Sequence, residues 1–192
     1  MHSQFNVKIT GHVKITDLTS QTVLVDRYNA INAESMSIIL ANMLQGNNSK
    51  YVYELHFGNG GSVVDETGDI TYKDVEENLK LGTVAELYNP VYYKVVDATD
   101  PVNNDDDTRN YSTVDHTDGL IYSDLVITCT VEENQPEITT NTGIITFDEI
   151  GLKSKGNTGL NSGYLLSHLV FEPIEKPAGR VIQVVYTLRV SL

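Results

Sequence analysis

The densest group of side chains that could bind an ion lies in one acidic stretch, residues 97–107. Its aspartates stand beside two asparagines, and carboxylate and amide oxygens are the ligands that Ca²⁺ prefers. The candidate calcium ligands are Asp100, Asp105, Asp106 and Asp107. Their spacing does not match the EF-hand loop, which also needs a glycine at its sharp turn. A solvated surface loop is therefore the favoured interpretation, and Ca²⁺ binding is the alternative.

Residues with catalytic potential are scattered along the chain. The five histidines stand far apart, and none lies at a metal-ligand spacing from another. The chain contains no HExxH, GxSxG or SxxK motif. Glu149 and His168 fall among strand residues, where polar side chains mostly serve structural hydrogen bonding. We expect no catalytic residue and no cofactor site; a hydrolase whose carboxylates meet across loops is a further alternative.

Two other motifs receive structural interpretations. Gly58-Asn59-Gly60-Gly61 follows a strand-like run, but no Walker lysine comes after it and no helix begins there. A tight turn with positive φ explains these glycines. The only cysteine, Cys129, lies on an alternating run and is predicted to be a buried, inert thiol. A single cysteine excludes internal disulfides and cysteine-based zinc sites.

Charge and hydropathy narrow the range of partners. The chain has 26 acidic against 13 basic residues, a net charge of -13, and no basic cluster, so we expect no direct nucleic-acid binding. No apolar run reaches membrane-spanning length and the N-terminus lacks a signal-peptide core, so we expect a cytoplasmic product with no membrane partner. The length of 192 residues predicts one domain, 1–192.

Near-strict alternation of apolar residues predicts a strand at each end of the chain. The first covers Phe5–Thr16, and a loop at 17–21 returns it to a partner strand, Thr22–Tyr28. The last begins at Ile182, and its side chains expected in the core are Ile182, Val184, Tyr186, Leu188 and Val190. Those expected on the outer face or at a subunit contact are Gln183, Thr187 and Arg189.

The remaining elements define the predicted fold class. Further strands are expected at 51–57, 91–96, 124–131, 144–147 and 164–171, and the last two should form a meander with the closing strand. One helix is predicted at about 33–45, capped by Asn32 and ended by Gly46. Its apolar stripe is expected to pack against a sheet as core, with ligand binding as the alternative, and consists of Met36, Ile39, Leu40, Met43 and Leu44. The polar segments 62–90, 97–119 and 132–142 read as long loops. The fold is predicted to be mainly β, an antiparallel sandwich or barrel-like sheet pair with one packed helix.

The order of these features resembles that of compact β-rich domains in tail-fibre-anchoring, baseplate and neck (collar) proteins of tailed bacteriophages. In both, a hairpin and a short helix lead to a strand that ends in glycines, here ELHFGNGG. The segment Asp148–Leu152 matches a later E-I/A-G-L element. The run L-x-x-H-x-x-F-x-P-I-x-K before the closing strand is matched by Leu165, His168, Phe171, Pro173, Ile174 and Lys176. The likeness covers about residues 30–192.

The resemblance implies a virion structural protein without enzymatic activity. Such a protein is made in the host cytoplasm and is present in the particle in multiple copies. Its partners would be other virion proteins of the tail, collar, baseplate or capsid, joined by an adaptor or fibre attachment point. Two alternatives stay open: a capsid decoration or head-fibre protein, and a carbohydrate- or receptor-binding module with candidate contacts at Tyr88, Tyr92 and Tyr93.

Overall fold

The computed structural model describes residues 6–47, 50–103, 108–137, 143–156 and 162–192. The strands in these ranges are β1 (Lys8–Asp17), β2 (Thr22–Ile31), β3 (Val52–Gly58), β4 (Ser62–Val64), β5 (Ile70–Tyr72), β6 (Pro90–Val95), β7 (Tyr111–Asp115), β8 (Tyr122–Val131), β9 (Ile144–Ser154), β10 (Leu165–Pro177) and β11 (Ile182–Ser191). The helices are α1 (Ala33–Leu44), α2 (Val75–Leu79), and the 3₁₀ turns η1 (Gly82–Val84) and η2 (Pro101–Asn103).

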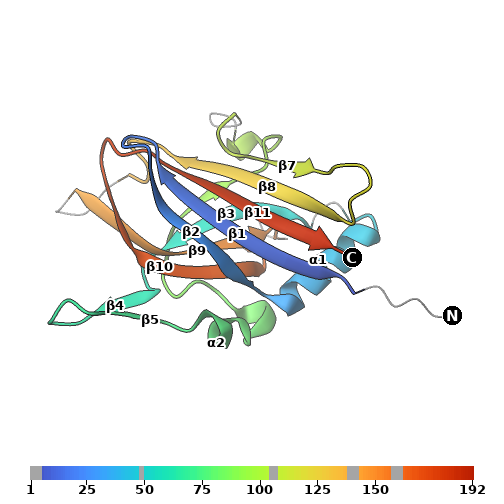
Figure 1. Cartoon of the computed structure of the whole chain (residues 1–192), viewed down its shortest axis with the longest axis horizontal. Coiled ribbons are helices and arrows are strands. Elements are labelled where there is room, and N and C mark those ends of the chain that lie inside the picture. Colours follow the sequence, from blue (N-terminus) through green and yellow to red (C-terminus); the bar gives the residue numbers. More distant parts are fainter. Residues whose placement is uncertain (1–5, 48–49, 104–107, 138–142, 157–161) are drawn as a thin grey trace.

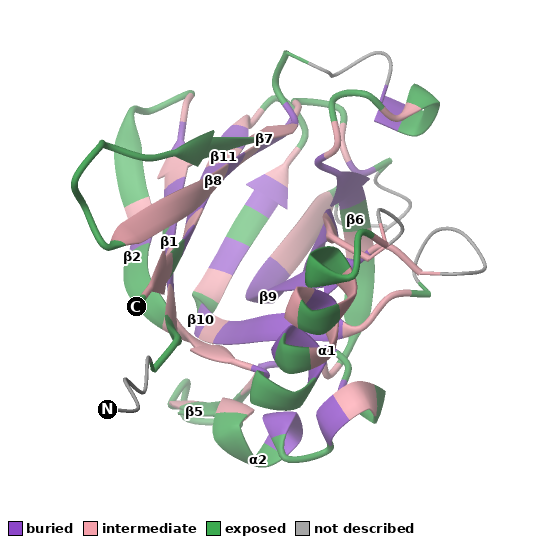
Figure 2. Cartoon of the chain, turned by 90° about the vertical axis from the view of Figure 1, so that its right-hand side faces the viewer, coloured by how far each residue is buried: buried purple, intermediate pink, exposed green. Residues whose placement is uncertain are grey.

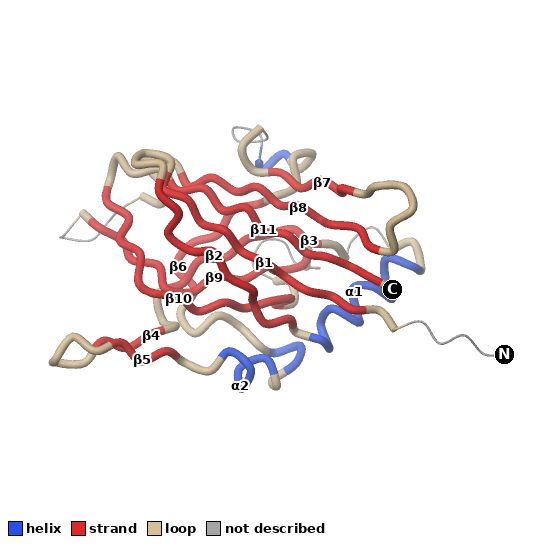
Figure 3. Tube along the Cα trace, in the orientation of Figure 1, coloured by secondary structure: helices blue, strands red, loops and turns tan. Residues whose placement is uncertain are grey.

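The main body is a nine-stranded antiparallel sheet that curls into a nearly closed barrel (Figures 1 and 3). The strand order is β6-β3-β9-β10-β2-β1-β11-β8-β7. The halves β6-β3-β9-β10 and β2-β1-β11-β8-β7 meet at a narrow junction, where β10 pairs with β2 through only two residue pairs. This confirms the predicted mainly β, barrel-like sheet pair.

The core lies between the two halves of the sheet, as the alternating sequences require. On β11, Ile182, Val184, Tyr186 and Leu188 are buried, whereas Gln183 and Thr187 are half-buried and Arg189 is exposed. The predicted faces of these residues are therefore confirmed. Val190, also predicted to be in the core, is only half-buried near the end of the strand. Cys129 is buried on β8 beside this strand, as predicted. Figure 2 shows that buried residues lie mostly on the strands of the barrel.

The predicted C-terminal meander is wrong in its last step. β9 and β10 pair as a hairpin, but β11 does not pair with β10. Instead β11 lies between β1 and β8, and the β1–β2 hairpin separates it from β10. Alternation fixes which face a strand buries, but not which strand lies beside it.

The helix α1 ends close to where the sequence places it. The Asn32 side chain accepts a hydrogen bond from the backbone N–H of Ser35 (3.1 Å), and Gly46 follows the helix with a φ of 83°. Asn32 also donates to the carbonyl of Gly82 (2.8 Å), which ties α1 to η1. The cap residue therefore fixes the helix and a distant turn together.

Two segments predicted as loops contain regular structure. Residues 62–90 form the β4–β5 hairpin, α2 and η1, and residues 97–119 contain η2 and β7. Both segments are polar, and their elements are only three to five residues long. Such short elements carry too few residues for a periodic pattern to emerge. We call residues 62–90 the cover, because they lie over the outer face of β9 and β10.

Candidate functional site

The acidic stretch does not present a free cation site in its described part. Asp100 accepts hydrogen bonds from the Tyr53 hydroxyl (2.8 Å) and the Lys155 ammonium (3.1 Å). Burial alone would lower the pKa of Lys155, but its bonds to the Tyr51 hydroxyl and Asp100 raise it. Lys155 thus supplies the positive charge that a cation would bring.

The other three calcium candidates, Asp105, Asp106 and Asp107, lie outside the described residues. Within the described ranges, no three His, Cys, Asp or Glu side chains gather closely enough to hold a metal ion.

The structure does bring Glu149 and His168 together, as the centre of a buried polar cluster. His168 Nε2 lies 2.8 Å from Glu149 Oε2, and both side chains are fully buried. Asn78 Nδ2 donates to the Glu86 carbonyl (2.8 Å) and lies 2.9 Å from His168 Nδ1. Because an amide nitrogen can only donate, Nδ1 is the acceptor and Nε2 carries the proton given to Glu149.

Backbone N–H groups supply the other hydrogen bonds to the Glu149 carboxylate. The N–H groups of Asn89 (2.8 Å), Tyr88 (2.9 Å) and Gly60 (3.1 Å) all donate to its carboxylate. Burial alone would raise the pKa of Glu149, but the hydrogen bonds from His168, Asn89 and Tyr88 outweigh it and hold the pKa below its usual value. The carboxylate is charged and fully engaged, which suits a structural anchor better than a general base.

The glycine run after β3 serves this cluster. None of Gly58, Gly60 and Gly61 has a positive φ, so the predicted reason for them is wrong. A Cβ on Gly58 would lie 2.4 Å from Glu149 Oε1, and one on Gly60 would lie 2.8 Å from the backbone nitrogen of Asn89. The glycines are needed because the carboxylate and the cover approach the backbone too closely for any side chain.

The cover closes the polar cluster from solvent. Its small apolar core packs Leu79, Ala85 and Leu87 against Leu165 of β10. Glu86 also reaches the fully buried Lys153 of β9 with two contacts of 2.7 and 2.8 Å. In the described chain, the buried polar side-chain atoms without a partner are Asn29 Oδ1 and Ser35 Oγ, and neither belongs to this cluster. We therefore assign the cluster a structural role.

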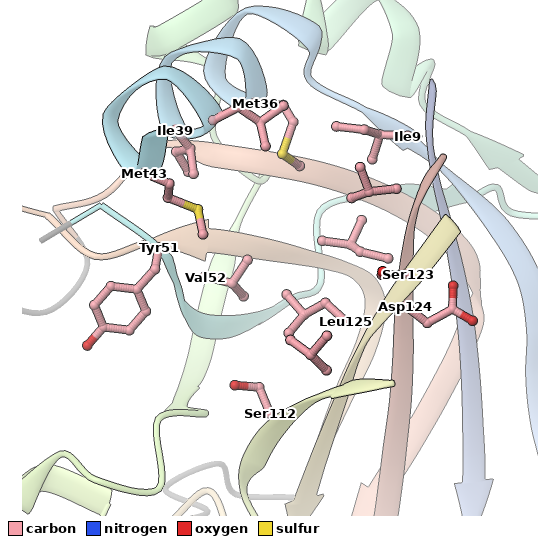
Figure 4. A pocket seen from close by; sticks show the side chains of 14 residues that line it. Ile9, Met36, Ile39, Met43, Tyr51, Val52, Ser112, Ser123, Asp124 and Leu125 are labelled. Atoms are coloured by element: carbon pink, nitrogen blue, oxygen red, sulfur yellow. The ribbon is translucent and has the colours of Figure 1, made fainter. Parts of the chain in front are cut away.

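A different region has the form of a binding site: an apolar pocket at the end of the barrel that carries α1. It has a volume of about 310 Å³, at the lower end of the range for ligand sites. Figure 4 shows Met36, Ile39 and Met43 pointing from α1 toward Val52 and Leu125. The remaining lining residues are Ile9, Leu40, Tyr51, Ser112, Val114, Ser123, Asp124, Leu188 and Val190.

Two polar residues of this lining, Asp124 and Tyr51, form hydrogen bonds with residues outside the pocket. Asp124 accepts two hydrogen bonds from Arg189, at 2.8 and 2.7 Å, which lower the pKa of the carboxyl and fix its charge. The Tyr51 hydroxyl donates to Asp97 (2.5 Å) and points away from the pocket (Figure 4). Apart from the Ser112 hydroxyl, what remains is an aliphatic and thioether surface that can recognise apolar groups.

Exposed apolar side chains lie on the lining of the pocket and on segments that adjoin its lining residues in the sequence. Met43 and Val114 line it while being 54% and 73% exposed. Leu44 at the end of α1 is 90% exposed. Ile121 is also exposed, and its carbonyl accepts from the backbone N–H of Leu192 (3.1 Å), so the β7–β8 connection meets the C-terminus there. A pocket with such a rim is typical of a contact surface for another molecule.

Sequence reasoning found one wall of this pocket but interpreted it as core. The apolar stripe of α1 does bury Met36 and Ile39, whereas Met43 and Leu44 are exposed, contrary to the prediction. The signal was a methionine-containing stripe that continued to the end of a helix. The sequence does not predict the opposite wall, because β7 lies in a segment that is predicted to be a loop.

The three tyrosines predicted as carbohydrate contacts do not form one surface. Tyr92 packs against Phe57 of the core, with ring centroids 6.0 Å apart. Tyr93 stacks on His56 (5.3 Å), on the outer face of the sheet. Tyr88 contacts His168 (5.3 Å) and its hydroxyl donates to the carbonyl of Asp74 in the cover.

Comparison of the chain with protein-family models, curated proteins and solved structures found no match. Among the described residues, the helices are all too short or too polar to cross a membrane.

Proposed function

We propose that this protein is a non-enzymatic structural component of a tailed-bacteriophage particle that joins other virion proteins at the tail, neck or baseplate. The observation that carries the proposal is the open apolar pocket with its exposed apolar rim. A surface of this kind supports docking of a protein partner. The resemblance of the closing segments to virion proteins supplies the setting.

The contrast between the polar and apolar regions supports the absence of an enzymatic role. Polar groups that could do chemistry, above all Glu149 and His168, are buried beneath the cover and bonded to one another. The apolar pocket at the α1 end of the barrel has no comparable set of groups. A hydrolase would need carboxylates that converge on an open site.

One observation favours a second candidate, a carbohydrate- or receptor-binding module, on a different surface from the one predicted. Tyr28 is 76% exposed on the outer face of β2, and His12 stands against its ring at 5.1 Å. Together with Thr10, Thr187 and Arg189 they line a shallow polar hollow. An exposed aromatic ring beside hydrogen-bonding groups can bind a sugar. A capsid decoration protein remains the other alternative within the virion.

A reconstruction of purified particles tests the proposal. We expect density for this chain as a symmetric ring at the neck, tail or baseplate, with the α1 end of the barrel against a neighbouring protein. Density distributed over the capsid lattice would favour the decoration alternative. Absence of the chain from purified particles would contradict the proposed function.

A further inference from the structure

The strand β7 leaves one edge of the sheet open beside the pocket. It is the last strand in the order and pairs with β8 through Tyr111–Asp115. In the described chain no strand pairs with its other edge, so alternate backbone N–H and C=O groups there have no sheet partner. Such an edge can accept a further strand from another chain.

The same strand forms one wall of the pocket. Ser112 and Val114 of β7 line it together with Met36 and Met43 of α1, and Figure 4 shows Ser112 on the opposite side of the pocket from α1. Side chains of a strand added to β7 would alternate in the same way, so every second one would enter the space between β7 and α1. The open edge of β7 and the apolar pocket therefore belong to one site.

We propose that this site binds an extended segment of another virion protein by strand addition to β7. The segment carries large aliphatic or methionine side chains at alternate positions, and these fill the pocket. The inference rests on the proposed function, because it names the kind of partner that the structural role requires. Main-chain hydrogen bonds to β7 position the segment, and the pocket selects its side chains.

Size and charge separate this partner from a second copy of the chain. Two copies paired through β7 would still present only Ser112 and Val114 toward the pockets, and these are too small to fill about 310 Å³. Asp115 ends β7, Asp118 follows it, and the whole chain has a net charge of -13. A segment with lysine or arginine at its ends is therefore favoured over an acidic one.

A synthetic peptide tests the geometry directly. The probe is a capped seven-residue peptide in which leucine alternates with threonine and lysine stands at both ends. Two further versions carry N-methyl groups, one on the leucine amides and one on the threonine amides. Only one set of amides can face β7, so we expect one methylated version to lose binding and the other to keep it.

Nuclear magnetic resonance of the full chain provides the readout. Methyl-labelled methionine gives three signals, of which those of Met36 and Met43 should shift. Backbone amides of Tyr111–Asp115 should shift at the same peptide concentrations. Val114→Asp should weaken binding about tenfold or more, because it places a charge at an apolar contact.

The matched control is Val84→Asp in η1, since Val84 is 74% exposed and Val114 is 73% exposed. Val84→Asp should leave the affinity unchanged. Equal binding of both methylated peptides, or methionine shifts without changes in β7, would overturn strand addition. A dimer of the protein alone that Val114→Asp dissociates would assign the edge to a second copy and would also overturn it. Either result leaves the particle reconstruction, and hence the proposed function, as a separate question.

Discussion

The covered face of β9 and β10 and the pocket between α1 and β7 show two opposite ways of treating a sheet surface. On the covered face, Glu149, His168 and Lys153 are fully buried and each has a partner. The pocket is apolar, and Met43 and Val114 on its rim remain exposed. The polar surface is closed and the apolar surface is open, the reverse of what solvation alone would favour.

This difference separates residues that hold the fold from residues available for binding. A buried charge must be paired, so the cluster around Glu149 constrains the cover and the glycine run around it. An exposed apolar pocket has no such internal requirement, and this is why we propose it as the contact surface for a partner. The following experiments test this contrast, beginning with the largest expected effect.

Removing the central carboxylate should be the most damaging change. Glu149→Ala leaves His168 and three backbone N–H groups without their acceptor, and each buried donor left unsatisfied costs about 1–3 kcal/mol. Urea unfolding measures the loss. Glu172→Ala, which removes an exposed carboxylate on the neighbouring strand β10, is the control and should stay within about 0.5 kcal/mol. Similar losses for the two variants would mean that the cluster does not anchor the cover.

Shortening a side chain in the core should lower the free energy of unfolding more than shortening one on the rim of the pocket. Ile127 is fully buried on β8, and Ile127→Ala should cost about 2–5 kcal/mol through lost contacts and a cavity. Val114→Ala on the neighbouring strand should change the free energy of unfolding by no more than about 0.5 kcal/mol, because Val114 is mostly exposed. The same urea titration compares them. A large loss at Val114 would show that the rim is part of the core.

Acid should weaken the covered face in particular. The pKa of Glu149 is lowered in the folded protein, so its contribution to stability is complete above the unfolded pKa and is lost as pH falls through the folded pKa. The stability difference between the parent and Glu149→Gln should therefore shrink as pH is lowered into the acid range. Thermal unfolding at a series of pH values measures it. A difference that stays constant with pH would contradict the charged, hydrogen-bonded state of Glu149.

Removal of divalent cations should have the smallest effect. Asp100 already bonds to Lys155 and Tyr53, so a chelator should leave the melting temperature essentially unchanged. Differential scanning calorimetry with and without chelator decides this. A drop of several degrees that Ca²⁺ restores and Na⁺ does not would show that the acidic stretch holds calcium after all.

Sequence reasoning reached the strands and the faces they bury, because long alternating runs such as Ile182–Leu192 carry that signal themselves. It did not reach the neighbours of β11, since pairing depends on the whole sheet. It found Glu149 and His168 as hydrogen-bonded strand residues, but not the cover that closes them. The pocket was missed because its second wall, β7, is only five residues long and follows a polar stretch.

Hydrogen exchange on the isolated protein and on assembled particles tests the contrast most directly. We expect the amides of α2 in the cover to be protected equally in both states, because the cover is held by contacts within the chain. The edge-facing amides of Tyr111–Asp115 should exchange rapidly in the isolated protein and gain protection in the particle. Equal exchange of β7 in both states, or protection gained only in the cover, would contradict the assignment of the open apolar end as the binding surface.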